Sequence, residues 1–369
     1  MTVLGSRALN RATLARQLLL RRSELTVPQA LEHLAGLQAQ TPHTWYVGLW
    51  SRLADYTPEG TARLLRERGA VRMALMRSTI HLVTAADCLW LRPLVEPVIE
   101  RMTMSNFRRG LTGLDLAELV AAGRELLAGG PLTFSGLGRA LAERWPENDP
   151  ASMAQAIRAY VPLVQVPPRG LWGESGPAAH QAVETWLGRP VDTDASPERL
   201  VLRYLAAFGP ATVRDVQHWC GLTRLAEVVE RLRPQLLVFR DERGRELFDL
   251  PGAPRPDPDT PAPVRFVYDY DNLLRSHADV SRLVTVDYAA QGFGEMSGEE
   301  PSTVLVDGFA AATWRIVKRR GTATLTVRPF RKLTGAEEAE VGAEGAALLA
   351  FAAAGAKAHE IVFAPPQPG

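Results

Sequence analysis

Cysteine is almost absent from this chain. Its 369 residues include two cysteines, Cys88 and Cys220, which lie far apart and outside any Cys-x-x-Cys spacing. Two such thiols exclude a disulfide framework and are expected to pack in the interior. The sequence shows no ligand spacing for another metal, so it predicts neither a metal site nor a cofactor.

Long apolar runs are also missing. Residues 1–20 hold Arg7, Arg11 and Arg16 between short apolar groups, with no stretch long enough for a signal peptide or a membrane span. We therefore expect no membrane association and a cytoplasmic protein. Glycine-rich phosphate loops, Ser-x-x-Lys sequences and nucleophilic-serine elbows are absent too, which argues against the enzyme classes that need them.

The chain has almost no excess of charge of either sign: it contains 42 basic and 41 acidic residues, for a net charge of +1. Lysine is rare, with only Lys318, Lys332 and Lys357. The basic residues nevertheless gather at 7–22, 101–109 and 315–332, and no acidic residue interrupts the last run. These patches could line one surface that binds a polyanion.

A repeat marks the internal organisation. Gly130-Pro131-Leu132-Thr133 and Gly209-Pro210-Ala211-Thr212 each place a threonine where it would cap a helix. After the second copy, helices 213–219 and 225–232 flank a break at 221–223, and strands 236–240 and 245–250 enclose a polar turn. Helix, turn, helix and hairpin together predict a winged helix.

Two further winged-helix units are expected upstream. The middle unit has helices 137–141 and 153–159 with a shortened wing formed by 161–166 and 170–172. The first has helices 10–20, 27–37 and 44–53 and a strand at 78–83. The expected boundaries are 1–115, 116–195 and 196–253.

A proline-rich linker at 254–261 separates these units from a β-rich domain at 262–363. Its expected elements are strands 264–268, 302–306, 312–317 and 322–327, a hairpin turn at 319–321, a helix at 335–354 and a closing strand at 360–363. The predicted fold class is α+β, with tandem winged helix-turn-helix units around a small antiparallel β-barrel or curled sheet.

Two glutamines, Gln38 and Gln40, lie in an expected turn between helices. Pro42 disfavours helical geometry at Thr41, so the backbone near Gln40 is expected to be extended and both side chains to project the same way. Paired amides can hold a water and donate to a phosphate or sugar oxygen, but they are poor bases. They suit a leaving group that needs little help, such as a purine alkylated at nitrogen 7. Alternatively, they are turn amides that satisfy backbone groups.

Three segments carry a resemblance to a known family. The runs 34–40 (LAGLQAQ), 48–53 (GLWSRL) and 77–87 (RSTIHLVTAAD) resemble the AlkZ-like DNA glycosylases, as do 268–274, 306–309 and 313–315 further on. The resemblance implies winged helices around a β-barrel in a C-shaped, DNA-binding molecule, with catalysis by Gln38 and Gln40. The related AlkX type has an aspartate at the second position, so Gln40 favours bulky, azinomycin-like guanine adducts and crosslinks as substrates.

Two other groups are candidates for DNA contact. Arg77, Thr79 and His81 alternate as on a strand and either face DNA or belong to a half-buried strand. Trp314, Arg315, Lys318, Arg319 and Arg320 lie on the expected hairpin, where a cationic tip would enter a groove, although a solvated hairpin is the alternative.

The sequence thus predicts a monomeric, monofunctional glycosylase acting on double-stranded DNA that carries alkylated bases. No lysine lies near Gln38 in sequence to form the Schiff base of a lyase step. Two other functions stay open: a winged-helix regulator that reads a DNA sequence, and a resistance protein that masks adducts without cutting a bond.

Overall fold

The computed structural model describes residues 2–194, 196–287 and 300–366, and it has an α+β fold, as predicted. The α-helices of the described residues are α1 (Ser6–Arg16), α2 (Val27–His33), α3 (Thr44–Arg52), α4 (Pro58–Arg66), α5 (Ala85–Phe107), α6 (Leu116–Ala128), α7 (Phe134–Ala142), α8 (Pro150–Tyr160), α9 (Val183–Leu187), α10 (Pro197–Phe208), α11 (Val213–Cys220), α12 (Leu225–Leu232), α13 (Asn272–Arg275) and α14 (Gly335–Ala352).

A six-stranded sheet lies at the centre of the chain's first half. Its order is β2 (Leu37–Gln38), β4 (Ile80–Thr84), β3 (Ala70–Ala74), β6 (Leu163–Gln165), β7 (Ala179–Ala182) and β5 (Leu132–Thr133). The antiparallel pair β3–β6 sets Arg72 opposite Gln165, so strands from both expected upstream units share one sheet. Helix α4 and strand β3 were not among the predicted elements, nor was the 23-residue helix α5.

Of the two strands expected for the wing of the middle unit, only the first forms. Strand β6 forms as predicted, but it pairs with β7 and not with 170–172, which lie in the loop between them. Pro167 and Pro168 follow β6 after Val166, and since proline has no backbone N–H they cannot continue the ladder. The chain therefore pairs again only at residue 179.

The elements predicted for 212–250 are confirmed. Thr212 caps α11 by accepting a hydrogen bond from the backbone N–H of Asp215, and Gly221 ends that helix at φ +82°. Helix α12 follows, and β8 (Leu237–Asp241) pairs with β9 (Glu246–Asp249) as an antiparallel hairpin. One addition is β1 (Val3–Leu4), which pairs parallel to β8.

A five-stranded sheet forms the C-terminal part, in the order β10 (Arg265–Val267), β11 (Thr303–Val306), β12 (Phe309–Arg319), β13 (Thr322–Pro329) and β14 (Ala358–Phe363). The first four strands are antiparallel, but β14 runs parallel to β13 because α14 carries the chain back along the sheet. Within the described residues β10 and β14 are open edges, so the expected closed barrel is wrong. Helix α14 covers an apolar face that closure would otherwise bury.

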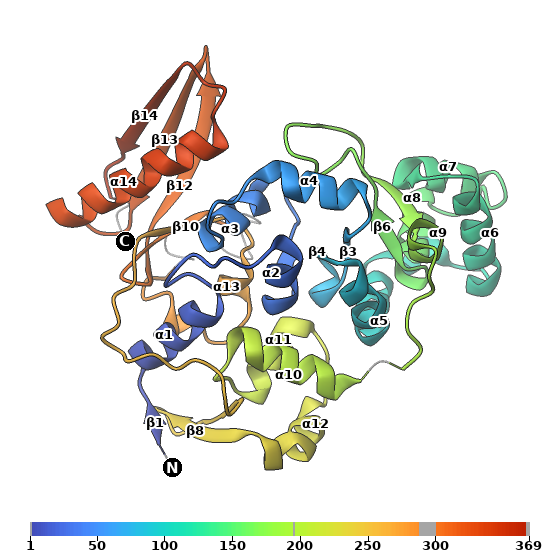
Figure 1. Cartoon of the computed structure of the whole chain (residues 1–369). Helices are drawn as coiled ribbons and strands as arrows, with labels where there is room; N and C mark the ends of the chain where they lie inside the picture. The colour runs from blue at the N-terminus through green and yellow to red at the C-terminus, as the bar shows by residue number, and fades with distance from the viewer. Residues whose placement is uncertain (1, 195, 288–299, 367–369) are drawn as a thin grey trace.

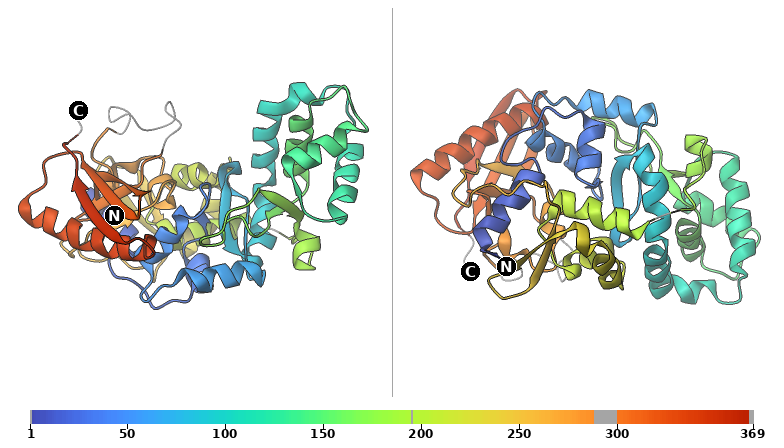
Figure 2. Two further views of the ribbon diagram at one scale, coloured as in Figure 1. Left: turned by 90° about the horizontal axis from the view of Figure 1, so that it is seen from above. Right: turned by 60° about the horizontal axis from the view of Figure 1, so that its bottom comes forward.

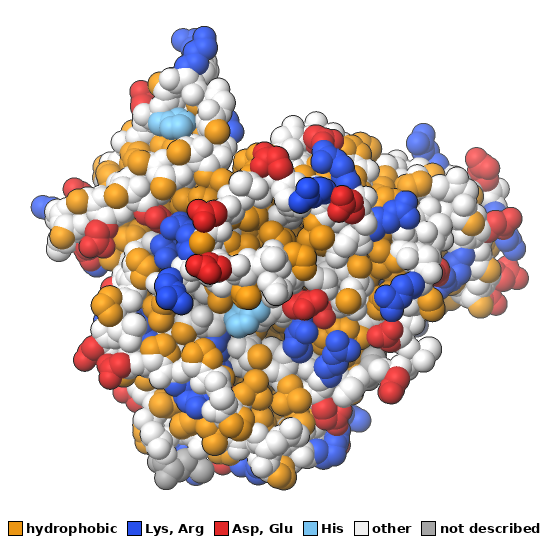
Figure 3. Space-filling model, in the orientation of Figure 1, with side chains coloured by type: hydrophobic (Ala, Val, Ile, Leu, Met, Phe, Trp, Pro, Cys, Tyr) orange, Lys and Arg blue, Asp and Glu red, His pale blue; other side chains and the backbone are white. Residues whose placement is uncertain are grey.

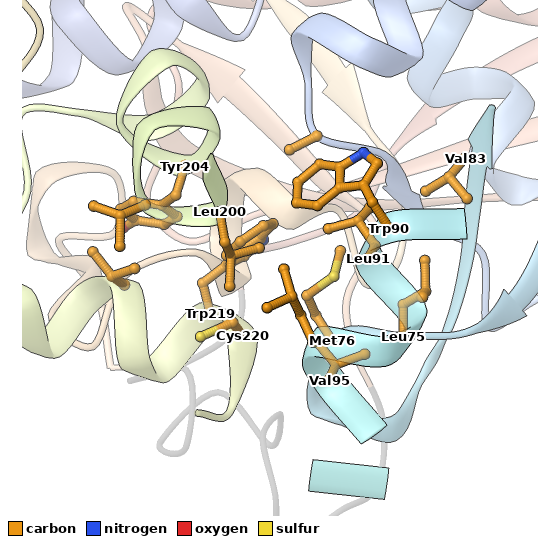
Figure 4. Close-up of a cluster of buried hydrophobic side chains, with 14 of the residues drawn as sticks. Leu75, Met76, Val83, Trp90, Leu91, Val95, Leu200, Tyr204, Trp219 and Cys220 are labelled. Carbon is orange, nitrogen blue, oxygen red and sulfur yellow. The ribbon is translucent and has the colours of Figure 1, made fainter. Parts of the chain in front are cut away.

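The elements are spread between two ends of the molecule. The hairpin β12–β13, with β14 and α14, projects at one end, while α6, α7 and α8 lie at the opposite end (Figures 1 and 2). Between them, Trp90 and Val95 of α5 belong with Tyr204 of α10 and Trp219 of α11 to one cluster of buried apolar side chains (Figure 4). This cluster fixes the sheet that carries β2 against the helices of the chain's middle. Among the described helices, none combines the length and apolar character needed to cross a bilayer.

Candidate active site

The two glutamines lie on an extended segment beside strand β4. Gln38 pairs with His81 in the β2–β4 ladder, and the N–H of Ala39 donates to the carbonyl of Ile80 at 2.7 Å. Leu37 and Gln38 form the short strand β2 where a turn between helices was expected, and the strand ends before Gln40. Gly36 precedes it at φ +85°, where a Cβ would lie 2.6 Å from Val83, so both its conformation and its space require glycine.

Both glutamine side chains have their oxygens turned toward the protein. The Oε1 of buried Gln38 accepts a hydrogen bond from Arg77 Nη2 at 2.6 Å, and the Oε1 of exposed Gln40 accepts one from the N–H of Ile80 at 3.2 Å. Guanidinium and peptide N–H groups can only donate, which fixes the orientation of both amides. No described residue accepts from either Nε2, so the pair offers N–H donors.

Arg77 is held at the centre of this arrangement. It lies in a left-handed conformation (φ +55°) in the short 3-10 turn of residues 76–78, and its guanidinium donates to the carbonyl of Trp219 at 2.5 Å and to Asn272 Oδ1 at 3.3 Å. Burial, and next the charge of Arg275, lower its pKa to about 10, which leaves it charged at neutral pH. Among the described residues no carboxylate forms an ion pair with Arg77. The electric field of its guanidinium is therefore not neutralised at the neighbouring glutamines.

The other two residues predicted with Arg77 are less accessible. Thr79 is half-buried and its hydroxyl donates to the carbonyl of Met76 at 3.0 Å. His81 is fully buried, with Nδ1 3.1 Å from the carbonyl of Thr79, and burial together with Arg77 lowers its pKa to about 3. The imidazole is therefore neutral and has no surface open to a ligand. Of the three, only Arg77 contacts the glutamine motif by its side chain.

Segment 268–272 supports the motif from a distant part of the sequence. The Tyr268 hydroxyl donates to the carbonyl of Gln38 at 2.7 Å, and Asn272 Nδ2 donates to the carbonyl of Gly36 at 3.2 Å. Close packing against α3 completes the contact, since a Cβ on Gly48 would lie 2.5 Å from the Tyr268 ring. Segment 268–272 therefore contacts the backbone of the segment that carries the glutamines.

The two carboxylates of this segment have different partners: Asp269 reaches the residue after Gln40, which the sequence did not reveal, and Asp271 pairs with α3. Asp269 accepts a hydrogen bond from the hydroxyl of Thr41, the residue after Gln40, and its Oδ1 is buried without a described partner. Asp271 forms a fully buried, two-pronged ion pair with Arg52 of α3, at 2.8 and 2.9 Å. The segment stood out only through the family resemblance, because no local pattern links positions 230 residues apart.

A second buried arginine lies behind Ala39. Arg72 Nη2 donates to the Ala39 carbonyl at 2.8 Å, and no described carboxylate pairs with it. Burial, and next the charge of Arg169, lower its pKa to about 10. Arg72 and Arg77 thus place two unneutralised charges around Gln38-Ala39-Gln40, an environment that favours an anion such as phosphate.

The predicted hairpin residues divide between its base and its tip. Trp314 is half-buried at the base, where its Nε1 donates to the carbonyl of Val267 at 3.0 Å, and Arg315 beside it is exposed. Lys318 Nζ donates to the carbonyl of Ala352 at the end of α14, at 2.8 Å. Arg319 and Arg320 are exposed at the tip, where basic side chains stand out at the projecting end in Figure 3. Positive φ at Arg320 and Gly321 forms the tight turn.

No group of three His, Cys, Asp or Glu side chains suited to a metal ion occurs among the described residues.

Comparison with known proteins identifies the class. A family model described as DNA glycosylase AlkZ-like matches residues 31–351, and the chain belongs to this family of DNA glycosylases. The structure resembles that of the Streptomyces sahachiroi DNA glycosylase AlkZ, with a TM-score of 0.74 and 18% identity over 98% of this chain and 100% of that one. At this identity the likeness establishes the fold. A search of curated proteins found no match.

The buried pair of Arg52 and Asp271 gives a stability prediction. Asp271→Ala leaves a guanidinium without its carboxylate in a site with 0% exposure, and we expect the free energy of unfolding to fall by roughly 3–5 kcal/mol. Arg52→Met/Asp271→Ala should recover part of this loss because it removes the stranded charge. Glu174→Ala, which breaks the exposed pair with Arg66, should cost no more than about 1 kcal/mol.

Denaturant unfolding of the three variants and the unchanged protein provides the measurement. Equal losses in Asp271→Ala and Glu174→Ala would show that the buried pair does not fix α3 to segment 268–272.

Proposed function

We propose that this chain is a monofunctional glycosylase that hydrolyses the N-glycosidic bond of alkylated purines in double-stranded DNA. Its substrates would be N7-alkylguanines, including bulky azinomycin-like adducts or interstrand crosslinks, and its role DNA repair or self-resistance to a genotoxin. The observation that carries the proposal is the pair of amide N–H donors on Gln38 and Gln40, fixed in place by Arg77 and Ile80. Family membership supplies the reaction class.

The chemistry of the leaving group matches such a site. Guanine alkylated at nitrogen 7 carries a positive charge and departs as a neutral base without prior protonation, so the site has to position groups more than to transfer protons early. The Nε2 groups of Gln38 and Gln40 would donate to phosphate or sugar oxygens. Each Oε1 keeps one lone pair that can accept a hydrogen from the attacking water.

Three charged groups complement the amides. Arg77 and Arg72 supply a fixed positive field that would hold the phosphate beside the lesion. Asp269, bonded to Thr41, supplies a carboxylate near the place where an oxocarbenium-like sugar would develop. We infer that these opposite charges act on different parts of the nucleotide: the backbone anion and the sugar.

The proposal includes no lyase step. A Schiff base needs a free amine near the sugar, and Lys318 Nζ, next to the hairpin tip, donates to the carbonyl of Ala352. No lysine contacts the glutamine motif within the described residues. The product would therefore be an intact strand with an abasic site.

The larger architecture belongs to the same proposal. Winged-helix units over 1–115, 116–195 and 196–253 and the β-rich domain over 262–363 would together form a C-shaped surface for one DNA duplex. Such a chain would act as a monomer on DNA in the cytoplasm. The helix-helix-hairpin order of α11, α12, β8 and β9 supports the third of these units.

The glutamine pair gives the principal prediction. With duplex DNA that contains one 7-methylguanine, the unchanged protein should produce abasic sites, revealed as strand breaks after alkali. Gln38→Ala/Gln40→Ala should slow single-turnover excision on the order of 100-fold or more, because it removes both donors. Gln235→Ala is the control: the same residue type, exposed in the turn at 233–235 between α12 and β8, with no hydrogen bond to the motif among the described residues.

The other candidate functions give different results in this experiment. Tight binding of 7-methylguanine and bulky-adduct DNA without excision would identify an adduct-masking protein, and preference for one undamaged sequence would identify a regulator. Full activity in the folded double variant would refute catalysis by the glutamines. Thermal unfolding verifies that each variant is folded.

The hairpin tip gives a prediction about DNA affinity. If Arg320 contacts a phosphate, Arg320→Ala should reduce the slope of log affinity against log salt by about one unit. Arg331→Ala should leave the slope unchanged, because Arg331 is already paired with Glu337 at 2.6 and 2.8 Å. Titration of a fluorescent duplex at several salt concentrations measures both slopes. Equal slopes for the two variants would remove the tip from the DNA interface.

A further inference from the structure

The turn that carries Arg77 has a strained backbone. Residues 75–79 connect β3 to β4, and two neighbours within this turn, Arg77 and Ser78, both have positive φ, at +55° and +60°. The left-handed conformation is unfavourable for a residue with a Cβ, and neither position is glycine. Two such residues in succession persist only where the surrounding contacts hold them.

The start of the turn is held by the apolar interior. Leu75 and Met76 are fully buried, and Figure 4 shows both among the buried apolar side chains. The N–H of Ser78 donates to the carbonyl of Leu75 at 2.9 Å, and the N–H of Thr79 donates to the carbonyl of Met76 at 3.1 Å. Neither bond uses the carbonyl or the hydroxyl of Ser78.

Arg158 binds both of these Ser78 oxygens. It lies in the last turn of α8, and its guanidinium donates to the carbonyl of Ser78 through Nη2 and to Ser78 Oγ through Nη1, the latter at 3.1 Å. Two donors on one rigid plane fix the direction of the carbonyl as well as its position. The flanking residues Ile157 and Ala159 are fully buried, so the part of α8 that carries Arg158 is itself fixed in the interior.

The charge of Arg158 has no acidic partner among the described residues. Burial, and next the charge of Arg92, lower its pKa to about 10, and burial, and next the charge of Arg158, lower the pKa of His180 to about 4. At neutral pH the arginine is therefore charged and the histidine is neutral. The two oxygens of Ser78 are the hydrogen-bond acceptors of this guanidinium.

The conformation of the turn decides where Arg77 points. The Arg77 guanidinium donates to Gln38 Oε1 at 2.6 Å and to the Trp219 carbonyl at 2.5 Å. A shift of Ser78 to the usual negative φ would reorient the backbone on either side of it, so Arg77 could not keep both bonds. The contact between Arg158 and Ser78 therefore reaches the glutamine motif through Arg77.

We infer that Arg158 is a positioning residue for base excision: it holds Ser78 in the left-handed conformation and thereby keeps Arg77 where it orients Gln38. The inference rests on the proposed glycosylase function and adds to it a residue that acts through the turn. Among the described residues Arg158 makes no hydrogen bond to either glutamine. Helix α8 of the middle unit thus takes part in the reaction without touching the motif.

The test measures single-turnover release of 7-methylguanine and DNA affinity for the unchanged protein, Arg158→Met, Ser78→Gly and Ser78→Gly/Arg158→Met. Glycine adopts a φ of this sign without steric cost, so the turn of the double variant should keep its conformation without the guanidinium. Arg92→Met is the matched control, because Arg92 is a buried arginine that donates to the carbonyl of Ala159, beside Arg158, and has no hydrogen bond to the turn among the described residues.

Arg158→Met should slow release about tenfold at unchanged DNA affinity, because a misplaced group lowers the rate of the chemical step without weakening binding. Ser78→Gly/Arg158→Met should recover most of the rate. Ser78→Gly alone and Arg92→Met should each release the base at nearly the rate of the unchanged protein. Thermal unfolding verifies that each variant is folded at the assay temperature.

Several results would overturn the inference while excision by the unchanged protein still supports the glycosylase. These are full activity in Arg158→Met, a loss that Ser78→Gly does not recover, an equal loss in Arg92→Met, and weaker DNA binding at an unchanged rate, which would make Arg158 a DNA contact. If the unchanged protein released neither 7-methylguanine nor a bulky N7 adduct, the proposed function would fail, and with it the inference that rests on it.

Discussion

The hydrogen bond from Arg77 to Gln38 is the interaction on which the site depends. A guanidinium can only donate hydrogen bonds, so Arg77 bonds to the amide oxygen of Gln38. The amide nitrogen, Nε2, then points away from Arg77. Arg77 in turn is held by the Trp219 carbonyl of α11 and by Asn272 of α13, and its turn is held by Arg158 of α8 through Ser78. Elements separated by up to 195 residues therefore converge on one side chain. The orientation of Gln38 is a property of the whole fold.

This arrangement has an energetic cost. Burial lowers the pKa values of Arg72, Arg77 and Arg158 to about 10, which means that each charge is less stable in the protein than in water. Other buried arginines are neutralised, as Arg16 with Asp249 and Arg52 with Asp271 show, although Arg282 donates to the carbonyl of Pro210 without a described carboxylate partner. Two unpaired charges beside the glutamine segment are understandable if an anion completes the site. A DNA phosphate has the required charge and geometry.

The sequence revealed local features better than distant ones. Thr133 and Thr212 as helix caps and the hairpin turn at Arg320 follow from residue types within a few positions, and the structure bears them out. The support of Gln38 by Tyr268 could not be derived, because backbone carbonyls leave no signal in the sequence. The open C-terminal sheet differs from the expected barrel for a similar reason: whether a helix or another strand covers an apolar face is decided by tertiary packing. The shared sheet that joins β3 to β6 was missed because pairing between distant strands is not encoded by periodicity.

The central claim is that segment 268–272 and Arg77 orient the glutamines for catalysis. The most direct measurement is single-turnover release of free 7-methylguanine, detected by mass spectrometry, for Tyr268→Phe and Asn272→Ala, with DNA affinity measured in parallel. Tyr268→Phe removes the hydrogen bond to the Gln38 carbonyl, and Asn272→Ala removes those to Gly36 and Arg77, while the side chains of Gln38 and Gln40 stay unchanged. The account predicts a slower release, on the order of tenfold, at unchanged affinity, because positioning and not binding is lost. Release at the unchanged rate by both folded variants would contradict it.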